Sequence, residues 1–288
     1  MPDLLILLPD FALIVLGYGI CHHTALDRPV WDGAERLVYY LLFPVLLFQA
    51  IVRSPIDAAS LLQVGGVGLT LAGVGIALAF ALGSLPGVDP LLHASGAQTA
   101  FRFNSYVALA LAERLAGAQG LAWQALLAAL CVPVCNVAAV WPLARQGGQG
   151  YLRELVRNPL ILSTLAGLLA NLAGLQLPDL LATTLSRIGA AALPLGLMAV
   201  GAGLRFGALR QGPRLAAGLM SIRHLVLPAV AIPLVIVLRL PPAQQAVLVA
   251  FSAMPTASSA YVAGLVTVST LLAMVGLPAA LALLAWLR

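Results

Sequence analysis

Long apolar runs recur along the whole chain, and they limit the fold more than any other feature. A helix of roughly 20 apolar residues crosses the hydrocarbon core of a bilayer. Only 9% of the residues are charged, whereas about 25% is usual in soluble proteins, so the chain lacks the charge to cover a water-facing surface. We therefore predict an all-α integral membrane protein with ten transmembrane helices at residues 4–22, 36–53, 60–83, 95–115, 121–143, 158–176, 180–203, 214–239, 243–263 and 265–287.

The ten expected spans fall into two groups of five around a polar stretch. We place the first five-helix repeat at residues 1–143, a cytoplasmic linker at 144–157 and the second five-helix repeat at 158–288. Because each repeat has an odd number of spans, the two would have opposite orientations, as in the inverted repeats of many transporters. QTAFRFNSYVALAL from Gln98 and FSAMPTASSAYVAG from Phe251 support the repeat, since both place small polar residues before Tyr-Val-Ala.

Arginines near the ends of the apolar runs predict the orientation in the membrane. The larger group lies in the stretches 24–36, 144–157 and 205–214, which fall on one side of the membrane in a ten-span chain. The positive-inside rule places this side in the cytoplasm. We therefore expect a multi-pass protein of the cell inner (plasma) membrane, with both termini on the non-cytoplasmic side.

Several function classes are disfavoured by the composition. The net charge of +5 comes from arginines, most of which lie at the ends of apolar runs, and they form no basic–aromatic patch, so we expect no nucleic acid as a partner. Cys131 and Cys135 are interpreted as small apolar residues of a helix interior. No nucleophile–base pair, glycine-rich phosphate loop or metal-ligand cluster stands out, and we expect neither an enzyme, nor a cofactor, nor a metal.

Polar residues inside the fourth and ninth spans indicate a functional site, because such residues are costly in a membrane and usually face a cavity or a partner. Pro255 would break the ninth helix, and a broken helix exposes N–H groups and partial charges that can hold an ion or an anion. The alternative is a kinked helix whose hydroxyls bond to its own carbonyls. We predict the substrate-binding residues Arg102, Asn104, Ser105, Tyr106, Pro255, Thr256, Ser258, Ser259 and Tyr261.

Two basic positions inside spans refine this hypothesis. Arg102 favours a carboxylate as the substrate, and the alternative is that it snorkels to an interface or pairs with Asp10, the one acidic residue expected within a span. Arg223 and His224 form a second basic pair in the eighth span, where His224 could relay a proton. We assign proton or ion coupling to His224, Arg223 and Asp10, with a structural role as the alternative.

Five segments resemble the auxin efflux carrier family. They are LGYGICHH from Leu16, LVYYLLFPVLLFQAIV from Leu37, RNPLILSTLAGLLANLAGLQLP from Arg157, AALPLGLMAVGAGL from Ala191 and AMPTASSAYVAG from Ala253. The resemblance covers nearly the whole chain and points to the bacterial malonate-carrier-like branch. It implies broken fourth and ninth helices that cross, a scaffold domain and a transport domain that move relative to each other, and a substrate held by Asn104, Ser105, Pro255, Thr256, Ser258 and Ser259.

The family resemblance implies a secondary active transporter that moves a small organic anion, such as a malonate-like carboxylate or an auxin-like acid, by alternating access. Its expected partners are the lipid bilayer, the carboxylate substrate and a coupling proton or sodium ion, with a homodimer as one candidate assembly. Two other hypotheses remain open. They are a sodium-coupled symporter of the bile-acid type and a non-transporting membrane receptor on the same scaffold.

The chain departs from the family pattern at two places. Phe101-Arg102-Phe103 lacks the proline that many relatives have in the fourth span, which weakens the expectation of a break there. Relatives also have a polar loop between the ninth and tenth spans, whereas here residues 246–286 must supply both spans. We therefore expect either a turn at Gly264 between two short helices, or one helix that does not cross fully.

Overall fold

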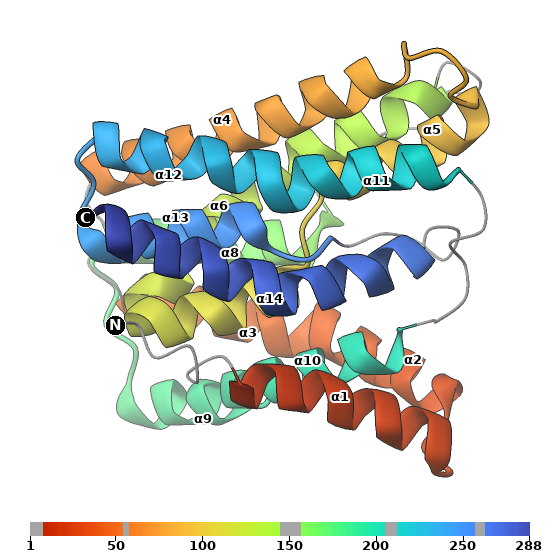
Figure 1. Ribbon diagram of the computed structural model, residues 1–288. Helices are drawn as coiled ribbons and strands as arrows, with labels where there is room; N and C mark the ends of the chain where they lie inside the picture. The colour runs from red at the N-terminus through yellow and green to blue at the C-terminus, as the bar shows by residue number, and fades with distance from the viewer. Residues whose placement is uncertain (1–7, 54–57, 145–156, 205–211, 257–262) are drawn as a thin grey trace.

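The computed structural model describes residues 8–53, 58–144, 157–204, 212–256 and 263–288, and in these ranges every regular element is a helix (Figure 1). The predicted all-α class is therefore confirmed. In chain order the helices are α1 (Leu8–His23), α2 (Arg28–Leu37), η2 (Val38–Leu42), α3 (Phe43–Arg53), α4 (Ala58–Leu82), α5 (Pro90–Gly96), η3 (Ala97–Ala100), α6 (Ser105–Ala144), α8 (Pro159–Leu172), α9 (Asp179–Ala190), α10 (Ala192–Ala202), α11 (Pro213–Ser221), η4 (Ile222–Val226), α12 (Leu227–Val237), α13 (Pro242–Ala253) and α14 (Ala263–Leu287).

Six stretches of the described chain are helical, long and apolar enough to cross a membrane. They are Arg28–Arg53, Ala59–Leu82, Pro90–Ala139, Asp179–Ala202, Pro213–Val237 and Leu265–Leu287. The predicted second, third, seventh, eighth and tenth spans each fall in one of them, and the fourth and fifth share another. The chain is therefore a multi-pass membrane protein, while the count of ten spans stays a prediction.

Large apolar side chains cover much of the outer surface. Leu62, Leu180 and Val275, for example, are 74%, 83% and 74% exposed. Exposure of such groups to water is unfavourable, whereas lipid tails are as apolar as leucine. The outer surface is thus suited to contact with lipid.

Many of the helices form two groups by their contacts, of which α1, α9 and α10 lie in the lower part of Figure 1 and α4 and α12 in the upper part. In the first, which we call the α1–α10 group (α1, α3, α8, α9 and α10), α1 packs along α10, and α3 packs against α8 and α9. In the second, the α4–α13 group (α4, α6, α12 and α13), the helices pack largely on one another. Helix α6 also contacts α3, α8 and α10, so it lies at the boundary between the groups.

Glycines permit the close contact between α1 and α10. A Cβ atom on Gly17 would overlap the backbone carbonyl of Met198, and one on Gly201 would overlap the backbone carbonyl of Ile14. Small residues of this kind let helix backbones approach closely in membranes, where packing contributes much of the association energy. The contact between the two helices therefore depends on the absence of side chains at these positions.

Two helices widen just before a proline. The π-helical turn η2 ends two residues before Pro44, and η4 ends two residues before Pro228. Proline has no N–H and crowds the preceding turn, so the regular ladder of hydrogen bonds is interrupted, and a π-turn accommodates the missing bond. These wide turns carry Tyr39 in η2, and Arg223 and His224 in η4.

Helix α6 contains a sharp turn that divides it between two predicted spans. The φ angle of Gly117 is 57°, in the left-handed region that glycine adopts without steric cost. The turn lies between the residues expected for the fourth span, 95–115, and the fifth, 121–143. The backbone therefore turns between these two expected spans.

Candidate binding site between two broken helices

The predicted fourth span is broken between α5 and α6. The 3₁₀ turn η3 follows α5, and residues 101–104 are not helical before α6 begins at Ser105. The side-chain Oδ1 of Asn104 accepts hydrogen bonds from the backbone N–H groups of Tyr106 at 3.0 Å and Val107 at 3.3 Å. This N-cap stabilises the start of α6, so the break forms although no proline is present there.

The predicted ninth span is broken after α13, where residues 254–256 are not helical. Pro255 has no N–H with which to continue the helix, as the sequence predicts. Helix α13 has 12 residues, and it is therefore about 18 Å long, shorter than the roughly 30 Å of a hydrocarbon core. Ser258, Ser259 and Tyr261 lie outside the described residues.

The sequence left two forms open for the short connection after the ninth span. Gly264 lies within α14, which begins at Ala263, so the expected turn at Gly264 is wrong. A ninth-span helix that does not cross fully agrees with the short α13. The reason is that α13 ends at Ala253 and residues 254–256 are not helical, while α14 begins at Ala263.

The two broken segments touch at their backbones. The N–H of Asn104 donates a hydrogen bond to the carbonyl oxygen of Pro255, at 2.9 Å. Nearby, the ring of Phe103 meets that of Phe251 edge to face, with centroids 4.7 Å apart. These contacts join the two broken spans, which are far apart in the sequence.

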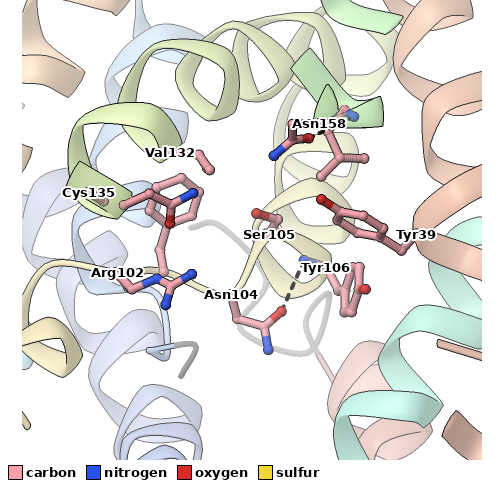
Figure 2. A pocket seen from close by; sticks show the side chains of 11 residues that line it. Tyr39, Arg102, Asn104, Ser105, Tyr106, Val132, Cys135 and Asn158 are labelled. Atoms are coloured by element: carbon pink, nitrogen blue, oxygen red, sulfur yellow. Dashed lines mark hydrogen bonds between the residues drawn. The ribbon is translucent and has the colours of Figure 1, made fainter. Parts of the chain in front are cut away.

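A cavity of about 320 Å³ lies beside the fourth-span break. Figure 2 shows side chains from the break, from the wide turn η2, from the later part of α6 and from the start of α8 arranged around it. The lining residues are Tyr39, Arg102, Phe103, Asn104, Ser105, Tyr106, Val132, Cys135, Asn136, Asn158 and Leu160. Four of the predicted substrate-binding residues, at positions 102 and 104–106, are therefore brought together.

The cavity has a positive electrostatic character. Among the lining residues that the structure describes, Arg102 is the one with a formal charge, and its Nη1 donates a hydrogen bond to Oε1 of Gln98 at 2.8 Å. Two helices also begin at the cavity: α6, capped by Asn104, and α8, capped by Asn158, whose Oδ1 accepts the N–H of Leu160 at 3.0 Å. Helix N-termini carry a partial positive charge. The arrangement is suited to an anion.

Asp10 does not neutralise Arg102. The carboxylate of Asp10 lies 3.2 Å from the guanidinium of Arg114, in an ion pair between α1 and α6. The ion pairs of the described residues join Asp10 to Arg114, and Arg28 to Asp32 and Glu35, and none of them includes Arg102. The alternative in which Arg102 pairs with Asp10 is therefore wrong.

Pro255, Thr256, Arg223 and His224 lie at the ninth-span break and are not among the residues that line the cavity. Arg223 donates hydrogen bonds to the carbonyls of Phe251 and Met254. His224 Nε2 lies 2.8 Å from Oγ of Ser269, which also accepts the backbone N–H of Thr256. Pro255 supplies its carbonyl to Asn104, as described above, and Thr256 is fully buried. Of the predicted substrate-binding residues that the structure describes, those at positions 102 and 104–106 line the cavity, whereas Pro255 and Thr256 do not.

Several lining residues were not predicted, although some carried a usable signal. Asn158 precedes Pro159, and Asn at the N-cap with Pro at the first helical position is typical of a helix start. Asn136 is a polar residue within an apolar run and could have been flagged in the same way as Asn104. Nothing in the local sequence distinguishes Tyr39 from Tyr40. Only the wide turn η2 and the contacts of distant helices place Tyr39 at the cavity.

Part of the chain matches a known protein family. Residues 142–283 match the model of a family described as membrane transport protein, and this segment includes the ninth-span break. The match supports the resemblance found in the sequence and indicates a membrane transporter. No curated protein matches the chain.

Proposed function

We propose that the chain is a membrane transport protein over its whole length and works as a secondary carrier that moves a small organic anion by alternating access. Malonate-like carboxylates and auxin-like acids, of the kind carried by the bacterial branch that the sequence resembles, are the proposed substrates. The single observation that carries this proposal is a cavity in which Arg102 meets the N-termini of α6 and α8.

The donors around the cavity are suited to a carboxylate. A guanidinium has five N–H donors, and Arg102 commits one of its Nη1 donors to Gln98. The side-chain amides of Asn104 and Asn158 use their oxygens as helix caps, so their NH₂ groups are the parts that can serve as donors to a ligand. A carboxylate accepts several such bonds at once, and bonds from a charged donor are the stronger ones.

The position of the cavity supports alternating access. Tyr39 and Asn158 adjoin α3 and α8 of the α1–α10 group, whereas residues 102–106 belong to the broken span that packs with the α4–α13 group. A relative movement of the two groups would change the exposure of a bound anion. The helix contacts also support an inverted repeat, in which the first and second spans correspond to the sixth and seventh. The contact of α1 with α10 joins the first span to the seventh, and the contact of α3 with α8 joins the second span to the sixth. Each contact is therefore the counterpart of the other.

Uptake into proteoliposomes tests the anchoring role of Arg102. We expect radiolabelled malonate or an auxin-like acid to accumulate, and Arg102→Gln to raise KM by about 10- to 100-fold, because a charged hydrogen bond contributes roughly 1.5–3 kcal/mol. Arg53→Gln is the matched control, since the Arg53 guanidinium is exposed and bonds to the carbonyl of Ala182 away from the cavity. Unchanged uptake by Arg102→Gln would remove Arg102 from the site. Absence of uptake for every organic anion would reject the carrier proposal.

The cell inner (plasma) membrane, with both termini on the non-cytoplasmic side, remains part of the proposal. It is supported by the arginines in the stretches 24–36, 144–157 and 205–214. In this orientation Asn158, which follows the linker, places the cavity toward the cytoplasmic half of the membrane.

A further inference from the structure

Arg223 is a charged side chain that the cavity does not use. It is 1% exposed and among the largest fully buried side chains of the described chain. Its Nε donates to the carbonyl oxygen of Met254 at 2.7 Å, and its Nη2 donates to the carbonyl oxygen of Phe251 at 3.2 Å. Both carbonyls belong to the broken end of α13. The guanidinium therefore caps this helix end from the neighbouring turn η4.

The break in the ninth span explains why these carbonyls need a partner. In a regular helix the carbonyl of Phe251 would accept the N–H of residue 255, but that residue is a proline and has no N–H. Met254 lies beyond the last helical residue, with φ −58° and ψ 148°. An unsatisfied carbonyl is costly away from water, and the C-terminal end of a helix also carries a partial negative charge. A cation is the partner that satisfies both requirements.

Broken helices of carriers commonly use such carbonyl ends to bind a coupling cation. Unwound backbone carbonyls and the C-terminal ends of half-helices coordinate sodium in several transporter folds. Here the guanidinium donates to two of these carbonyls, and the ion pairs found among the described residues do not include Arg223. Its charge is therefore balanced by the helix end.

We propose that the guanidinium of Arg223 occupies the carbonyl site at the broken end of α13 as a built-in cation, so that no sodium ion binds there. The anion is then carried without sodium, and this consequence rests on the proposed carrier function. Two further hydrogen bonds hold the backbone around the site. The carbonyl of Pro255 accepts the N–H of Asn104, and the N–H of Thr256 donates to Ser269.

Arg102 and Arg223, which both lie within apolar runs, then have different roles. Arg102 faces the cavity, where a substrate can reach it, while Arg223 is enclosed and bonded to the backbone. Loss of Arg102 is expected to weaken binding of the anion. Loss of Arg223 is expected to leave two carbonyls in a site that a small external cation can occupy.

Thermal unfolding of the purified protein tests the site without any transport measurement. We expect the wild-type midpoint to be the same in sodium chloride and in choline chloride at equal concentration. We expect Arg223→Ala to lower the midpoint by roughly 5 °C or more, and millimolar guanidinium, but not choline, to recover part of the loss. Arg53→Ala is the control, because it also removes a guanidinium–carbonyl bond, but at an exposed position where added guanidinium should have no effect.

Three results would overturn the proposal: a wild-type midpoint that sodium raises above its value in choline, an Arg223→Ala variant as stable as wild type, or an Arg223→Ala variant that guanidinium does not recover. If Arg223→Ala yields no folded protein, the wild-type comparison of sodium with choline decides. In proteoliposomes, anion uptake that persists when choline replaces sodium supports the proposal, and uptake that requires sodium overturns it. Absence of uptake in both salts rejects the carrier function instead, while the unfolding measurements still test the site.

Discussion

Gly17→Ala tests the contact between α1 and α10 by adding one methyl group. The new Cβ would overlap the backbone carbonyl of Met198 on the neighbouring helix. No rotamer change can relieve this overlap, because the alanine side chain has no rotamers and the carbonyl of Met198 belongs to the helix backbone. The two helices would have to move apart along their whole contact.

The expected size of the effect follows from two opposing contributions. Alanine is favoured over glycine inside a helix by about 1 kcal/mol, and overpacking a tight contact costs about 1–3 kcal/mol or more. Because the overlap is with backbone, we expect the upper end, and a net loss of about 2 kcal/mol. Gly19→Ala on the same helix is the matched control, since nothing lies within 4 Å of its new Cβ. It should gain about 1 kcal/mol.

Thermal unfolding of the two purified variants in one detergent measures this difference. A gap of about 3 kcal/mol corresponds to roughly 6–12 °C in the unfolding midpoint for a chain of this size, with Gly17→Ala below wild type and Gly19→Ala at or above it. Equal midpoints for the two variants would show that α1 and α10 do not make this contact, and would remove the helix pairing that supports an inverted repeat.

Two further predictions concern the break and the ion pair. Asn104→Ala should lower stability by about 1 kcal/mol through loss of the α6 cap. Asn104→Asp should keep the cap and the stability, but it should raise KM for an anion by adding a negative charge to the cavity. Denaturation measures the first effect and uptake the second, and equal behaviour of the two variants in both assays would contradict these predictions. A double-mutant cycle on Arg114 and Asp10, whose side chains are 39% and 14% exposed, should give a coupling below about 1 kcal/mol, and a much larger coupling would mean that the pair is shielded from water.

Much of the fold could be predicted because membrane insertion is a local property of the chain. Long apolar runs with few charges specify helices in lipid, whatever the rest of the chain does. The break at Pro255 was predictable for the same reason, since a proline acts on its own helix. The break before Ser105 was less clear from the sequence, because its cap, Asn104, competes with the strong helical tendency of the surrounding apolar residues.

The roles of the charged residues were not predictable in the same way. Arg102 and Arg223 both lie within apolar runs, and the sequence offered Asp10 as the partner of Arg102 and coupling roles for Arg223 and Asp10. The structure pairs Asp10 with Arg114 and bonds Arg223 to the end of α13. These partners are separated by many residues in the sequence, so local patterns contain no information about them.

The sequence by itself therefore determined that this chain is a helical membrane protein and that its ninth span is interrupted at Pro255, because hydrophobicity and proline act over a few residues. Only the tertiary structure decided that the interrupted segments meet at Asn104 and Pro255, and that Tyr39 and Asn158 join Arg102 around one cavity. It also decided that Arg223 is enclosed. The physical reason is that the burial and the partner of a charge depend on which distant helices pack beside it.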